Sequence, residues 1–186
     1  MKITSSIAAS IAFLFAFAAG ALAQAGDWSP AVEVRHDDEL CVAYQARVDG
    51  SYLVVRATLG AGWHTFAMDN KARAAEKLAG KPAISIDRAT EITAGGGLQT
   101  AGPWYQTPPK DFSRPELRWF SWGFDRQAQF VTKVGRAGSA ASTLTLKGQA
   151  CTEKICKNVD VSIAAPAAEA SAAASSTDLK DLVQVR

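Results

Sequence analysis

Two cysteines, Cys151 and Cys156, lie five positions apart near the end of the sequence, and lysines stand before, between and after them, at Lys147, Lys154 and Lys157. A connection of four residues is a common length for a β-hairpin loop, and the positions that flank such a loop face each other across the ladder. Directly opposed residues have Cα atoms about 4.5 Å apart in a non-hydrogen-bonded pair, which is within the range of a disulfide. We therefore expect Cys151 and Cys156 to form one reversible, chemically active pair.

A disulfide that closes so short a loop is a weak structural staple. In the chain-entropy model, it stabilises the folded state by about 2 kcal/mol, against about 4.7 kcal/mol for a disulfide that closes a loop of 100 residues. The neighbouring lysines favour a thiolate, and the thiolate is the species that attacks a disulfide. Spacing alone leaves two interpretations open, a hairpin staple and a redox pair.

The segment from Gln149 to Cys156, in an exported β domain, resembles the Gln-x-Cys-x(4 or 5)-Cys active segment of DsbD-type thiol:disulfide interchange proteins, in their N-terminal periplasmic domain. The element Gly62-Trp63-His64 is similar to the Gly-Trp-His or Gly-Tyr-His element of the same family. The likeness covers roughly Trp28 to Ala165.

This resemblance implies an immunoglobulin-like domain in which Cys151 and Cys156 are the catalytic residues. They would carry electrons between the thioredoxin-like domain of a membrane electron transporter and exported disulfide proteins, without a cofactor. Cys156 would attack the substrate disulfide and Cys151 would resolve the intermediate. In the family an aromatic loop caps the cysteines, and Phe120–Phe124 is the best local candidate, although ordinary core packing is the favoured interpretation of these residues.

Two rival functions remain. One is a non-enzymatic immunoglobulin-like binding module with a structural hairpin disulfide. The other is copper binding by the cysteines with His64 and Met68, but no spacing is typical of a metal site. We expect His64 to be an ordinary, satisfied histidine at the end of a strand rather than a ligand or a base, and His36 to lie in a solvated turn.

Composition and motifs exclude further classes of function. The formal net charge is +2 and no basic run interleaves with aromatic residues, which argues against nucleic-acid binding. Signatures of serine hydrolases and nucleotide-binding proteins are missing from the sequence.

The first residues predict a secreted or periplasmic protein. Residues 1–23 combine a positive start, an apolar run from Ile7 to Ala19 and a small-x-small cleavage site, as in a signal peptide. We expect no transmembrane segment after cleavage. Of the three cysteines, Cys41 is left over by the pair, and we expect it to be a small buried residue on a strand.

The remaining sequence predicts an all-β, immunoglobulin-like β-sandwich over residues 26–165 with one short inserted helix, followed by a flexible Ala/Ser-rich tail over residues 166–186. The clearest signal is a hairpin of strands 40–48 and 52–59 around Asp49-Gly50-Ser51. We expect the helix over 71–79, capped by Asp69-Asn70 and ended by Gly80. Further strands are expected at 83–87, 91–93, 127–134, 142–149 and 159–163, with a long surface loop over 95–115.

Overall fold

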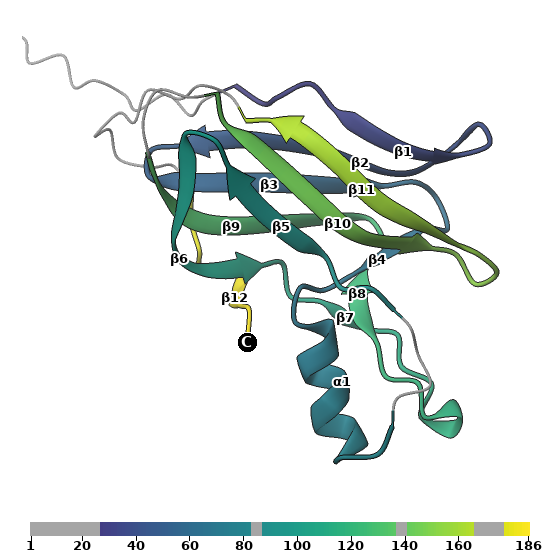
Figure 1. Cartoon of the computed structure of the whole chain (residues 1–186). Helices are drawn as coiled ribbons and strands as arrows, with labels where there is room; N and C mark the ends of the chain where they lie inside the picture. Colours follow the sequence, from purple (N-terminus) through teal and green to yellow (C-terminus); the bar gives the residue numbers. More distant parts are fainter. Residues whose placement is uncertain (1–26, 83–86, 137–140, 166–176) are drawn as a thin grey trace, which may run out of the picture.

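A computed structural model describes residues 27–82, 87–136, 141–165 and 177–186, and its strands form the two sheets of a β-sandwich (Figure 1). The first sheet has the order β1 (Val32–His36), β2 (Glu39–Asp49), β3 (Tyr52–Leu59), β9 (Gln127–Arg136), β6 (Leu98–Gln106) and β12 (Val183–Gln184). The second has the order β11 (Cys156–Ala164), β10 (Thr143–Cys151), β4 (His64–Phe66), β8 (Trp122–Phe124) and β7 (Lys110–Asp111). β5 (Glu91–Gly95) also pairs with β10. The predicted all-β, immunoglobulin-like sandwich with one short helix is confirmed.

The β2–β3 hairpin supplies one side of the core and follows the predicted alternation. Gly50 has a φ of 58° in the turn, a left-handed conformation that glycine adopts without steric cost. The inward side chains of both strands are buried, as the sequence predicts: Val42, Tyr44, Ala46 and Val48 in β2, and Leu53, Val55, Ala57 and Leu59 in β3. They pack against Leu144, Leu146 and Ile163 of the second sheet, so the apolar core lies between the two layers.

The expectation of a surface loop over residues 95–115 is wrong. Leu98–Gln106 forms β6, which pairs with β9 on one side and β12 on the other. Pairing with β9 is interrupted between Thr100 and Trp104, where the register shifts. The irregular stretch holds Gly102 and Pro103, and a bulge is one of the few places where a sheet accepts a proline, which has no N–H to donate. The loop prediction gave the prolines of this stretch, Pro103 among them, too much weight.

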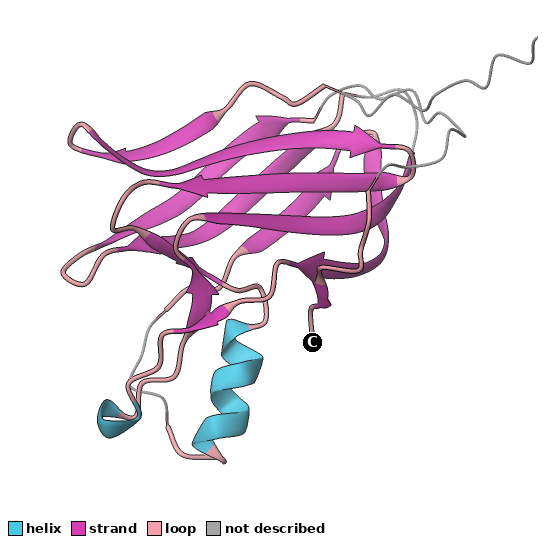
Figure 2. Ribbon diagram, turned by 180° about the vertical axis from the view of Figure 1, so that it is seen from behind, coloured by secondary structure: helices cyan, strands magenta, loops and turns pink. Residues whose placement is uncertain are grey.

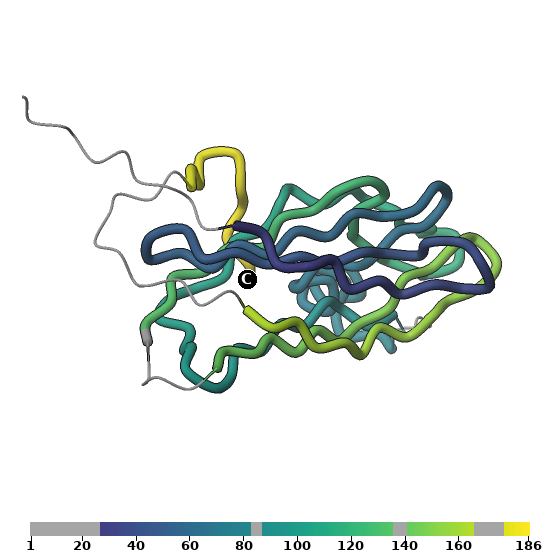
Figure 3. The backbone as a smooth tube through the Cα atoms, turned by 90° about the horizontal axis from the view of Figure 1, so that it is seen from above, coloured from purple at the N-terminus to yellow at the C-terminus, as the bar shows by residue number. Residues whose placement is uncertain are grey.

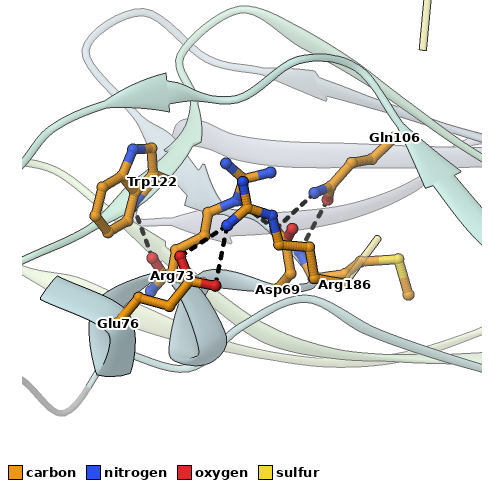
Figure 4. Close-up of polar contacts among 8 residues, drawn as sticks. Asp69, Arg73, Glu76, Gln106, Trp122 and Arg186 are labelled. Carbon is orange, nitrogen blue, oxygen red and sulfur yellow. Dashed lines mark hydrogen bonds and ion pairs between the residues drawn. The ribbon is translucent and has the colours of Figure 1, made fainter. Parts of the chain in front are cut away.

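Helix α1 (Asn70–Leu78) confirms the predicted helix to within a residue at each end. Asp69 occupies the N-cap position, but its side chain does not cap the helix. Its carboxylate Oδ1 instead accepts hydrogen bonds from Arg73 Nε at 2.9 Å and from Gln106 Nε2 at 2.7 Å (Figure 4). Asn70 Oδ1 accepts the backbone N–H of Trp122 at 2.7 Å. The start of the helix is thereby joined to both sheets.

The last residues of the chain return to the first sheet. Residues 177–186 were predicted to belong to a flexible tail, but they make a turn at Lys180-Asp181 and then β12, which pairs with β6. The Arg186 guanidinium contacts the Glu76 carboxylate of α1 at 2.8 Å (Figure 4). The rest of the predicted tail, 166–176, lies outside the described residues, as do the predicted signal peptide and most of the strand expected at 83–87.

Two parts of the molecule project from the sandwich. Helix α1 and the 3-10 helix η1 (Pro115–Leu117) extend together beyond one edge (Figure 2). The β10–β11 hairpin and the β1–β2 turn reach the same end of the sandwich (Figure 3). Within the described ranges, no helix has the length and apolar character needed to cross a membrane.

Candidate functional site

The tip of the β10–β11 hairpin carries the cysteine pair. Cys151 and Cys156 are register partners and form a disulfide with a Cα–Cα distance of 4.0 Å, as the spacing predicts. In the four-residue loop, the Thr152 N–H donates to the Ile155 carbonyl at 2.8 Å. The Thr152 hydroxyl accepts the backbone N–H groups of Lys154 and Ile155, both at 3.2 Å. The loop is held by its own hydrogen bonds as well as by the disulfide.

The two cysteines differ sharply in exposure. Cys151 is buried, with 2% of its surface exposed, whereas Cys156 is exposed. A disulfide is attacked along the line of approach to one sulfur, so access decides which sulfur a partner reaches. The fold therefore presents Cys156 to a partner and holds Cys151 beneath it.

The disulfide lies on the outer face of the second sheet, away from the core. Thr65 in β4 points inward, where it contacts Tyr44 between the sheets and donates a hydrogen bond to the Gln149 carbonyl at 2.8 Å. Neighbouring residues in a strand point to opposite faces, so His64 and Phe66 point outward. Cys151 is the register partner of His64 and shares this outer face.

His64 lies beside the disulfide in an apolar setting. Its ring centroid is 5.4 Å from that of Phe66 and 5.1 Å from that of Phe112. Burial lowers the pKa of the imidazole below its usual value, against the opposing influence of Asp87 and Asp125. The Nε2 atom is buried and has no hydrogen-bond partner. The prediction of a satisfied histidine is therefore wrong at this atom.

A depression of about 210 Å³ adjoins both cysteines, and Trp119 forms part of its wall. The Trp119 Nε1–H donates a hydrogen bond of 2.8 Å to Asp87 Oδ2, which fixes the indole next to the hairpin tip. A second hollow of about 390 Å³ continues from His64 and Trp119 to Phe112. Phe112 and Trp119 come from the segment between β7 and β8, which also contains η1 and extends beyond the sandwich beside α1 (Figure 1).

The predicted cap candidate Phe120–Phe124 does not line this depression. Trp122 and Phe124 are buried in β8, and Phe120 lines a separate groove against α1. Core packing, the favoured interpretation of this cluster, is confirmed for Trp122 and Phe124. The aromatic side chains that line the depression with the cysteines are those of Trp119, Phe66 and His64, and Phe112 contacts His64. Local sequence signals did not distinguish Trp119 and Phe112 from the other aromatics of the same region.

The lysines are distributed unequally around the pair. Lys154 lines the depression beside the disulfide. Lys157 follows Cys156 in β11 and so points to the other face, where its charge acts on Cys41. Lys147 lies opposite Asp160 and Glu91 in the strand ladders. Of the three lysines expected to favour a thiolate, only Lys154 borders the site.

Cys41 is a free, fully buried cysteine of the core, as predicted. Burial raises the pKa of its thiol, an effect that the Lys157 charge only partly offsets. His36, expected in a solvated turn, lies at the end of β1 with its ring edge-on to Trp63 at 6.2 Å. In the part of the chain that the structure describes, no group of three or more His, Cys, Asp or Glu side chains has the arrangement of a metal site.

Comparison with known proteins adds a similarity of fold. No protein-family model and no curated protein matches the sequence. Among solved structures, the chain is similar to the N-terminal domain of DsbD from Neisseria meningitidis, in its reduced form, with 12% sequence identity. The match covers 78% of this chain and 91% of that chain with a TM-score of 0.40. A likeness at this level assigns neither family nor function, so the function has to be argued from the cysteine site itself.

Proposed function

We propose that this chain is an exported thiol:disulfide exchange domain whose reactive centre is the Cys151–Cys156 pair. The observation that carries the proposal is the asymmetry of the pair: one cysteine is exposed at a hairpin tip and its partner is buried directly opposite. An exchange centre needs one sulfur that a partner protein can reach and a second that only the first can reach. The hairpin supplies both without any change in the strands.

Exchange at this site follows from these positions. In the reduced protein, the Cys156 thiolate attacks a partner disulfide and forms a mixed disulfide, and the displaced partner sulfur leaves as a thiolate that takes up a proton. The Cys151 thiol then loses its proton and attacks the Cys156 sulfur, which releases the second partner sulfur. Two electrons pass to the partner disulfide, and Cys151 and Cys156 are left joined.

The hairpin allows both redox states to share one fold. The ladder between β10 and β11 continues from Thr143 to Cys151, and the loop has its own backbone hydrogen bonds. Reduction thus removes a covalent link at the end of the ladder and leaves the core packing in place.

The partners that we propose are a thioredoxin-like domain of a membrane electron transporter, which would reduce the pair, and exported disulfide proteins, which would oxidise it. The Gln149–Cys156 segment and its resemblance to DsbD-type active segments support this assignment. The signal-peptide pattern of residues 1–23 supports an oxidising compartment outside the cytoplasm, periplasmic or secreted.

The test combines a reduction potential with a trapping experiment. Equilibration with glutathione should give a reduction potential above about −300 mV, whereas structural disulfides typically lie below this value. Cys151→Ser should form a stable mixed disulfide with purified thioredoxin activated as its thionitrobenzoate adduct, whereas Cys156→Ser should form little, because Cys151 is buried. A pair that resists glutathione, with no adduct from Cys151→Ser, would support the rival function, a binding module with a hairpin staple.

A further inference from the structure

We propose that His64 is the proton acceptor for Cys151 in the resolving step, the step in which the buried cysteine closes the disulfide and expels the partner. This inference rests on the proposed exchange function and adds a residue to it. It starts from the exposure of the two thiols. Cys156 is exposed, so water can take its proton, whereas Cys151 is 2% exposed and needs a base within the protein.

His64 is placed to be that base. It is the register partner of Cys151 across the β4–β10 ladder, and directly opposed side chains have Cβ atoms about 4.5 to 5.5 Å apart on the same face. The imidazole and both cysteines also line the same depression. The register and the shared depression therefore place the imidazole next to Cys151.

The Nε2 atom has no competing partner. It is buried and accepts no hydrogen bond, although a buried polar atom without a partner is costly and most are satisfied. A buried ring nitrogen that accepts no hydrogen bond is suited to receive a proton from the neighbouring Cys151. If packing were the only role of His64, a hydrogen-bond partner at Nε2 would make the folded protein more stable, yet this site provides none.

Burial keeps the His64 ring neutral and ready to accept a proton. Burial lowers the pKa of His64, so the imidazole stays unprotonated to lower pH than an exposed histidine. Asp87 and Asp125 act against this and stabilise the imidazolium once it forms. Arg114, Glu153 and Lys154 also border the two hollows and complete the set of charged side chains around the ring.

The resolving step transfers one proton to His64 and exchanges one disulfide bond for another. The Cys151 thiol gives its proton to Nε2, and its sulfur attacks the Cys156 sulfur of the mixed disulfide. The bond between Cys156 and the partner sulfur breaks, and the partner leaves as a thiolate. The imidazolium afterwards returns its proton to solvent. In the opposite direction, when the disulfide is reduced, the imidazolium protonates the Cys151 thiolate as it leaves.

The reaction of the fully reduced chain with 5,5′-dithiobis(2-nitrobenzoate) separates attack from resolution. Attack by Cys156 releases one thionitrobenzoate and leaves the second on the protein; resolution by Cys151 releases the second. The buried Cys41 should stay unreactive until the protein unfolds. Cys151→Ser should release one equivalent only, at the rate of the wild-type first phase.

His64→Gln is the decisive variant, because glutamine keeps the volume and polarity of the side chain but does not titrate in this range. We expect an unchanged first phase and a second phase slower by about 100-fold at neutral pH, the usual contribution of a general base. The rate of the wild-type second phase should be nearly independent of pH above the His64 pKa. In His64→Gln, the rate of the second phase should rise about tenfold per pH unit, because it follows the fraction of Cys151 present as thiolate. His36→Gln, at the other histidine of the chain, is the matched control and should behave as wild type.

A second variant separates chemistry from folding. His64→Ala should show the same slow second phase, and added imidazole should restore it in proportion to its concentration. If both phases occur and His64→Gln resolves at the wild-type rate and with the wild-type pH profile, the assignment of His64 is wrong and exchange at the cysteines stands. If the wild-type protein shows no first phase, the proposed exchange function itself fails.

Discussion

The indole Nε1–H of Trp119 donates a hydrogen bond of 2.8 Å to the Oδ2 atom of Asp87, across 32 positions of the sequence. Both residues line the depression that holds the cysteine pair. The guanidinium of Arg114 lies 5.5 Å from the centroid of the same indole ring, a further contact that holds it in place. Trp119 is thus a fixed wall next to the disulfide.

We expect Trp119→Ala to speed reduction of the disulfide by glutathione, because the wall is removed. Trp119→Phe keeps the ring but loses the N–H donor, a hydrogen bond worth about 1 kcal/mol, so its rate should rise by about fivefold. Rates can be measured by alkylating the freed thiols and weighing the protein by mass spectrometry. Equal rates for wild type and both variants would show that Trp119 does not control access.

Removal of the disulfide should leave the fold intact. The closed loop is short, so Cys151→Ala/Cys156→Ala should lower the free energy of unfolding by only about 2 kcal/mol, together with a small packing loss at the buried Cys151. In a chain of this size, that corresponds to a fall in melting temperature of several degrees. Thermal unfolding by circular dichroism, with and without dithiothreitol, measures it. A global loss of structure in the reduced wild type would contradict the exchange mechanism.

The local parts of the fold followed from the sequence because the signals themselves are local. The alternation of Val42, Tyr44 and Ala46 indicated which face of β2 is buried, and Gly50 marked the turn. The cysteine pairing was predictable for the same reason, since a four-residue connection determines which positions face each other. None of these inferences needs knowledge of distant residues.

Long-range contacts were not predictable in this way. Strand β6 was missed because its bulge around Gly102 and Pro103 resembles a loop, and only the neighbouring β9 shows that pairing resumes. Trp119 reaches the cysteines and Phe112 reaches His64 through long-range packing that no local pattern encodes. The sequence resemblance pointed to His64, but the lack of a partner at its buried Nε2 is visible only in the folded structure.

Asp69 makes a pH-dependent contribution to stability. Burial tends to raise its pKa, but the hydrogen bonds from Arg73 and Gln106 outweigh burial and hold the pKa below its usual 3.8. The folded state therefore favours the carboxylate, and this stabilisation is present above the unfolded pKa and is lost as pH falls through the folded pKa. The relevant window lies below about pH 4.

We expect Asp69→Asn to lower the free energy of unfolding at neutral pH by about 1 to 3 kcal/mol, the range for a broken buried hydrogen bond to a charged group. The difference from wild type should shrink below pH 4, where Asp69 itself becomes protonated. Urea unfolding at neutral and acid pH measures both values. Asp178→Asn is the control, because that exposed carboxylate pairs with Lys180 at the surface and its loss should not change stability measurably. A difference that persists unchanged at acid pH would contradict the assignment.

Thr152 determines how firmly the hairpin tip is held when the disulfide is open. Its hydroxyl accepts the backbone N–H groups of Lys154 and Ile155, both at 3.2 Å. Thr152→Val removes this acceptor and keeps the branched shape of the side chain. Each lost hydrogen bond should destabilise the loop by about 1 kcal/mol. We expect the two amides to exchange faster with deuterium in reduced Thr152→Val than in reduced wild type. Thr152→Ser retains the hydroxyl and should protect both amides. If all three proteins exchange these amides equally fast after reduction, the disulfide alone orders the loop, and Cys156 would not be held in place for attack in the reduced state.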